Sequence, residues 1–225
     1  MTTYQLASYV KDLYDLPPGD NGPFDIVLRE RKDHGVNVGV VEDYDKTIFV
    51  FRGSVTPEDW ARDAISYLPD QRNGLTLPLG FDLGMEEAFR NLKYFLKKAK
   101  MIFITGHSLG AAHAAIFRDL VLRSTDDIPE QTLLMGCPNL TLSGSEEISP
   151  KVLSFKNESD FVCDVPPAPW GPLFPLIRIE GGHDAMPNLF MFHHIDYYLA
   201  GIKRWEDSQY YLAGIKKGEE SPSKA

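Results

Sequence analysis

Apolar residues recur along this chain at two spacings, one typical of helices and one typical of strands. The helical spacing predicts a first helix over residues 2–16, which a Pro-Pro-Gly sequence would end. Its clearest instance spans residues 81–96, where Asp82 is placed to cap the first turn. A further helical stretch is predicted from residue 195 to residue 202.

Six apolar runs have the length and composition of β-strands. The first two alternate apolar with polar or small residues, as half-buried strands do. Runs such as residues 101–105 are continuously apolar, which is typical of strands buried on both faces. The six predicted strands are residues 24–29, 36–41, 47–51, 101–105, 132–135 and 152–155. Residues 163–175 contain five prolines and are predicted to form a rigid loop, because proline is excluded from helix interiors and central strands.

The alternation of strands and helices predicts the α/β class in one domain. A length of 225 residues is that of a single domain, which we expect to span residues 1–217 before a polar tail at 218–225. Seven residues, 197–203, recur identically at 210–216. A single repeat of this length indicates a local duplication and not a solenoid.

Composition and charge exclude several classes of protein. A hydrophobic fraction of 43% supports a packed core and excludes disorder over most of the chain. The chain has 23 Lys and Arg against 32 Asp and Glu, a net charge of -9. An acidic surface repels phosphate, so nucleic acid is not an expected partner, and contact with a lipid surface is expected to be transient at most.

Targeting signals and cofactor ligands are not evident. No stretch approaches the roughly eighteen apolar residues of a membrane-spanning helix, and residues 1–11 lack the apolar run of a signal peptide. We therefore expect a cytoplasmic protein, or one otherwise not exported by the Sec pathway. Cys137 and Cys163 are too few for a disulfide scaffold, and the sequence leaves their separation open, as it does the oligomeric state. No metal-ligand spacing is present, so neither a metal nor an organic cofactor is expected.

One motif carries chemistry. Gly106-His107-Ser108-Leu109-Gly110 follows an apolar run and precedes an alanine-rich stretch, the strand-to-helix context of a nucleophile elbow. Glycines two residues before and after the serine avoid clashes in so sharp a turn. The hydroxyl of Ser108 would then project at a helix amino terminus, where the N–H of Leu109 can face a developing oxyanion.

A nucleophilic serine needs a histidine base, and in this architecture the base follows both the serine and the acid along the chain. His34 and His107 precede the serine and are interpreted as structural, and His113 lies in the helix that the elbow opens. The remaining candidates are His183, His193 and His194.

The acid is expected in the loop after a strand that follows the elbow. A carboxylate within residues 156–160, after the predicted strand 152–155, would lie at the same sheet edge as Ser108. Asp164 is its local rival, whereas Asp184 and Asp196 lie too close to the histidines along the chain.

Four blocks, in order, resemble the class 3 (fungal-type) lipases. They are Phe51-Arg52-Gly53-Ser54, the elbow, Gly136-Cys137-Pro138, and Asn157-Glu158-Ser159-Asp160-Phe161-Val162. The resemblance implies an α/β-hydrolase fold, a central, mostly parallel β-sheet flanked by helices on both faces.

The resemblance also implies roles for individual residues. Ser108 matches the nucleophile and Asp160, rather than Asp164, the acid. Ser54 matches the residue whose N–H joins that of Leu109 in the oxyanion hole. The block from His193 to Leu199 resembles one near the end of several members, a register that favours His193 over His194 and His183 as the base.

We therefore expect a carboxylic ester hydrolase, a lipase or esterase that cleaves acylglycerol-type lipid esters through a Ser-His-Asp triad and an acyl-enzyme. The predicted lid, residues 56–62, is mostly polar where secreted members carry more aliphatic residues, which predicts weak interfacial activation. Phospholipase A1-like or thioesterase activity, or a binding protein on a hydrolase scaffold, are the alternatives.

Overall fold

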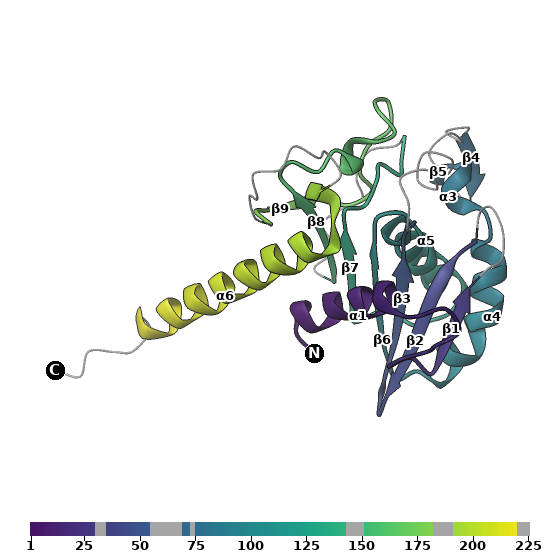
Figure 1. The fold of residues 1–225 in the computed structure, drawn as a ribbon, viewed down its shortest axis with the longest axis horizontal. Coiled ribbons are helices and arrows are strands. Elements are labelled where there is room, and N and C mark those ends of the chain that lie inside the picture. The colour runs from purple at the N-terminus through teal and green to yellow at the C-terminus, as the bar shows by residue number, and fades with distance from the viewer. Residues whose placement is uncertain (30–34, 55–68, 73–74, 143–150, 182–190, 220–225) are drawn as a thin grey trace.

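A seven-stranded sheet forms the centre of the protein in a computed structural model, which describes residues 1–29, 35–54, 69–72, 75–142, 151–181 and 191–219 (Figure 1). The strands lie in the order β1-β2-β3-β6-β7-β8-β9. Neighbouring strands are antiparallel from β1 to β3 and parallel from β3 to β9. Their bounds are β1 Ile26–Arg29, β2 Asn37–Asp43, β3 Lys46–Arg52, β6 Met101–His107, β7 Gln131–Met135, β8 Val152–Asn157 and β9 Leu176–Ile179.

All six strands predicted from the sequence are confirmed, within a few residues at their ends. Strand β9 was not predicted, because its four residues directly follow Pro175 and are too few to show a pattern. It lies at the end of the sheet order, where a preceding proline is tolerated. A two-stranded hairpin, β4 (Pro69–Arg72) with β5 (Leu75–Pro78), was also not predicted.

Helices cover both faces of the sheet, as expected. On one face lie α1 (Thr3–Asp15) and α6 (Ile195–Glu219), and on the other α4 (Met85–Lys98) and α5 (Leu109–Ser124) (Figure 1). Strand β3 serves both cores, since Phe49 and Phe51 pack with α5 whereas Ile48 and Val50 pack with α1 and α6. Residues buried from both sides explain the continuous apolar run of this strand.

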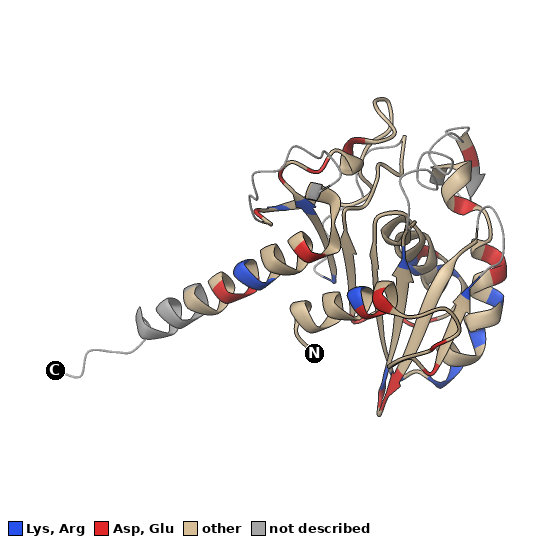
Figure 2. Cartoon of the chain, in the orientation of Figure 1, with Lys and Arg blue, Asp and Glu red and all other residues tan. Residues whose placement is uncertain are grey.

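The first turn of the longest predicted helix differs from the expectation. Asp82 does not cap it, because the chain first forms a single turn, α3 (Leu79–Asp82), and then breaks. Gly84, at φ +78°, is the N-cap of α4, a conformation that glycine adopts without steric cost. Acidic residues still lie in the first turn of α4 and lysines in its last, as the helix dipole favours (Figure 2).

Helix α6 extends well beyond the predicted stretch and away from the sheet (Figure 1). It contains both copies of the duplicated segment, which lie in different environments: Tyr198 of the first copy is buried, whereas Tyr211 at the matching position is exposed. The helix includes the first two residues of the predicted tail, and residues 220–225 lie outside the described part of the chain. Among the described helices, none has both the length and the apolarity needed to cross a bilayer.

Candidate active site

The elbow predicted at Ser108 is a strained turn between β6 and α5. Ser108 has φ 61° and ψ -131°, a conformation that non-glycine residues rarely adopt, and its side chain is almost fully buried. A Cβ on Gly106 would collide with the backbone of Gly110. The two glycines are therefore required for strand and helix to approach so closely.

The loop that carries Ser54 lies against this elbow. A Cβ on Gly53 would lie 2.7 Å from the carbonyl oxygen of His107 and 2.8 Å from Cβ of Ser108. Leu109 is the first residue of α5, where backbone N–H groups have no acceptor within the helix. The two backbone segments predicted to form the oxyanion hole thus meet at the nucleophile.

Asp160 is buried in the loop that follows β8. Its Oδ1 accepts a hydrogen bond from the Val162 N–H at 2.9 Å, and its Oδ2 lies 2.7 Å from Nδ1 of His193. Its rival Asp164 has a different partner, because both of its carboxylate oxygens lie 2.7 Å from Nζ of Lys156 and its side chain is mostly exposed. The structure brings Asp160, and not Asp164, to a histidine.

His193 also differs from the other candidate bases. Its Nε2 is buried and has no hydrogen-bond partner among the described residues, so this nitrogen is available to take a proton. The side chain of His194 is 60% exposed and lies 3.4 Å from Asp196. His183 and Asp184, like His34 and the predicted lid at residues 56–62, lie outside the described residues.

His113 is buried in α5. Burial lowers its pKa to about 4, so this histidine is neutral at physiological pH.

Two residues that support Asp160 and His193 were not identified from the sequence. The buried hydroxyl of Tyr198 donates a hydrogen bond of 2.5 Å to Oδ2 of Asp160. Burial, with nearby Cys163 and Asp160, raises the pKa of Tyr198, which keeps this hydroxyl protonated. Asn157 donates from Nδ2 to the carbonyl oxygen of Phe192, next to His193. Tyr198 lies within the block that resembled the family, but only its spatial position shows which tyrosine reaches the acid.

The two cysteines are buried free thiols. Cys163 Sγ lies 3.9 Å from Oδ2 of Asp160. Cys137 is close enough to contribute to the raised pKa of Cys163. Burial raises the pKa of both thiols, which disfavours the thiolate form that a nucleophile requires.

Gly136 offers a test of how tightly the site is packed. It has φ +60°, and a Cβ there would lie 2.8 Å from Cε1 of His193 and 3.1 Å from Oδ2 of Asp160. We expect Gly136→Ala to lower kcat about 100-fold, because displacement of a catalytic group by an ångström has effects of that size. Steady-state kinetics would check this, with Gly19→Ala as the control, since Gly19 also has positive φ but open space around it. Equal kcat values for the two variants would show that the contact is unimportant.

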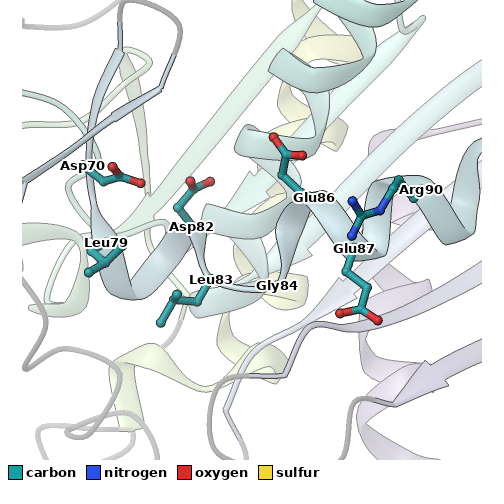
Figure 3. Close-up of a pocket in the computed structure, with 8 residues that line it drawn as sticks. All are labelled: Asp70, Leu79, Asp82, Leu83, Gly84, Glu86, Glu87 and Arg90. Carbon is teal, nitrogen blue, oxygen red and sulfur yellow. The ribbon is translucent and has the colours of Figure 1, made fainter.

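A separate pocket of about 320 Å³ lies where β4, α3 and the start of α4 meet (Figure 3). Its wall includes the acidic residues Asp70, Asp82, Glu86 and Glu87, together with Arg90. None of the candidate catalytic residues lines it. In the described part of the chain, no group of three or more His, Cys, Asp or Glu side chains could hold a metal ion.

The fold resembles those of several solved structures. Solved structures with a similar fold include a mutant form of MDLA from Penicillium cyclopium (18% identity, 82% of this chain and 79% of that chain covered, TM-score 0.59). They also include a nonglycosylated lipase of Yarrowia lipolytica (17% identity, 78% of each chain covered, TM-score 0.59). A third is the triacylglyceride lipase of Rhizomucor miehei (18% identity, 79% of this chain and 78% of that chain covered, TM-score 0.55). No curated protein matches the chain in sequence.

The sequence comparison with protein families is decisive for classification. The model of the family described as lipase (class 3) matches residues 48–170, which is more than half of the 225 residues. The matched range contains the elbow, the segment before it that carries Ser54, and Asp160. The chain therefore belongs to the class 3 lipases, a family of carboxylic ester hydrolases with the α/β-hydrolase fold.

Proposed function

We propose that this protein hydrolyses acyl esters of lipids, of the acylglycerol type, with Ser108 as nucleophile, His193 as base and Asp160 as the orienting acid. The observation that carries the proposal is the pairing of Asp160 with Nδ1 of His193, which leaves a buried Nε2 without a partner among the described residues. A neutral imidazole held in this way has its basic nitrogen directed away from the acid.

The proposed reaction assigns one role to each of these three side chains. Nε2 of His193 takes the proton of the Ser108 hydroxyl while Oγ attacks the acyl carbonyl carbon, and it then protonates the departing alcohol. Water repeats the two steps on the acyl-enzyme and releases the fatty acid. The hydrogen bond between Ser108 and His193 would form as substrate binds, since such bonds often tighten only in the Michaelis complex.

The N–H groups of Ser54 and Leu109 would stabilise the oxyanion. Two observations support this role: the close packing of Gly53 on Ser108, and the position of Leu109 at the amino terminus of α5. Donors held in place before reaction need no reorganisation as charge develops, which makes this contribution large in acyl transfer.

Family membership supports a lipid ester as the substrate, as does the likeness to a triacylglyceride lipase of Rhizomucor miehei. The triad itself does not select the leaving group, so a phospholipid or a thioester would follow the same steps. Because the protein has a net charge of -9, anionic lipids would repel it, whereas uncharged acylglycerols would not.

The test combines histidine variants with a substrate panel. We expect His193→Ala to lower kcat by at least about a thousandfold on every ester of a series graded in acyl length, because it removes the base. His194→Ala is the matched control and should keep most of the activity, since that side chain is largely exposed. An inactive His194→Ala with an active His193→Ala would overturn the choice of base. Faster cleavage of phospholipids or thioesters than of acylglycerols would overturn the substrate class.

A further inference from the structure

Tyr14 and His107 join two parts of the candidate site by an unbroken chain of hydrogen bonds. The backbone N of Gly53 lies 3.1 Å from the hydroxyl oxygen of Tyr14, and this oxygen lies 3.1 Å from Nδ1 of His107. Nε2 of His107 lies 2.7 Å from the carbonyl oxygen of His193. The chain therefore runs from the loop that carries Ser54 to the backbone of the proposed base.

The position of every proton in this chain follows from its partners. The carbonyl of His193 can only accept, so Nε2 of His107 carries the hydrogen and Nδ1 of the neutral ring accepts. The Gly53 N–H can only donate, so the Tyr14 oxygen accepts from it and gives its own proton to Nδ1. Each group has one role, and no second arrangement of a neutral imidazole satisfies all three bonds.

The surroundings keep both side chains in the required protonation state. Burial, with the neighbouring His193, lowers the pKa of His107, so the ring stays neutral. Burial raises the pKa of Tyr14, so the phenol keeps its proton. The ring of His107 stacks on that of His193, with centroids 4.6 Å apart and planes 29° apart.

The helix that supplies Tyr14 is itself tied to the segment that supplies His193. Helix α1 packs against α6, which begins two residues after His193. At one end the N–H of Thr3 lies 2.7 Å from Oε1 of Glu206, and at the other Nζ of Lys11 lies 3.3 Å from Asp196. The position of Tyr14 is thus coupled to that of the base by two routes, one through the site and one along the helices.

We propose that Tyr14 and His107 are positioning residues. They hold the backbone of His193 and the loop of Gly53 and Ser54 at fixed positions relative to each other. The inference rests on the proposed function and extends it to residues that take no part in the making or breaking of bonds. A buried polar chain of this kind is costly wherever one bond is missing, because the remaining groups stay desolvated. A single missing bond should therefore shift the base and the oxyanion donors relative to each other.

Tyr14→Phe tests the first link with a minimal change. The phenylalanine keeps the ring but leaves the Gly53 N–H and Nδ1 of His107 without partners. Active sites are counted from the amplitude of fluorophosphonate labelling, and kcat is expressed per labelled site, so that a loss of folded protein does not affect the result. We expect kcat per site to fall about 10- to 100-fold with little change in KM, the size of effect that misplaced catalytic groups produce. Tyr9→Phe removes a hydroxyl from the same helix, where the ring packs on Phe24, and should match wild type.

Two variants of His107 separate the second link from simple packing. Asparagine places its carbonyl oxygen near the position of Nδ1, so His107→Asn keeps the acceptor for Tyr14 but loses the donor to His193. Glutamine reaches the position of Nε2, so His107→Gln keeps that donor. We expect His107→Asn to lose about as much kcat per labelled site as Tyr14→Phe, because it releases the carbonyl of His193. His107→Gln lacks only the acceptor for Tyr14 and should lose a smaller part. A residue that acted only through packing would not produce this order.

Two outcomes would overturn the inference. A wild-type kcat per labelled site in Tyr14→Phe would show that the bridge does not position the base, while the proposed function would stand. Equal activity in His107→Asn and His107→Gln would show the same for the bond to His193. A wild-type protein that neither labels nor hydrolyses esters would overturn the proposed function and this inference together.

Discussion

Ser108→Ala is expected to abolish ester hydrolysis while the protein stays folded. Without the hydroxyl no acyl-enzyme can form, and loss of a nucleophilic serine costs about 10⁶-fold in kcat in a well-studied serine protease. The backbone strain at Ser108 is set by the turn and its glycines, so alanine should adopt the same conformation. Turnover of a short-chain ester and labelling by a fluorophosphonate would both be measured, and both should vanish.

The control for this variant is Ser208→Ala, which removes an exposed hydroxyl of α6 that donates to the carbonyl oxygen of Trp205 in the same helix. It should react with the fluorophosphonate and hydrolyse the short-chain ester as the wild-type protein does. Thermal unfolding curves that match wild type would show that Ser108→Ala is folded. If Ser108→Ala kept more than a small percentage of wild-type activity, the assignment of the nucleophile would be wrong.

Asp160→Asn should be the second most damaging change, with a loss of about 10⁴-fold in kcat, as for the equivalent change in a serine protease. The asparagine amide can hold the imidazole in the wrong tautomer, with the proton on Nε2, and a protonated Nε2 cannot act as a base. Asparagine also has one carbonyl oxygen for the donors that now share two carboxylate oxygens, from Val162, His193, Tyr198 and the thiol of Cys163.

Asp164→Asn is the matched control, four residues away in the same loop region. It weakens the ion pair with Lys156, whose own side chain is only 6% exposed. Because Asp164 itself is well solvated, we expect a loss of about 1 kcal/mol in the free energy of unfolding and little change in kcat. Measuring kcat and the unfolding midpoint of both variants separates the two effects. Equal losses of kcat in the two variants would mean that the acid has been misassigned.

The elements that could be predicted from the sequence are those whose pattern records burial. Strands β3 and β6 have apolar residues at consecutive positions because both faces of each are covered. The elbow is partly local, since Gly106 is required by its close contact with Gly110, four residues further on. Gly110 is required by its close contact with the backbone of Phe51 in β3. Such requirements leave a signature in the order of residues.

The base, the positioning residues and the edge of the sheet could not be derived in the same way. His193 and His194 are neighbours with the same chemistry, and only the entry of α6 onto the sheet places one ring on Asp160 and the other in solvent. The duplicated segment makes the point most directly, because identical tyrosines are buried at 198 and exposed at 211.

The sequence by itself determined the class of fold, the nucleophile candidate and the family, because each depends on patterns within short stretches of chain. The family resemblance favoured His193, but only the tertiary structure shows that its ring meets the carboxylate and which tyrosines support the site. It brings Tyr14 of the first helix within 3.1 Å of His107, 93 positions further along the chain. Contacts between residues so far apart depend on how whole helices pack, and packing free energy is a property of the complete core that no local pattern encodes.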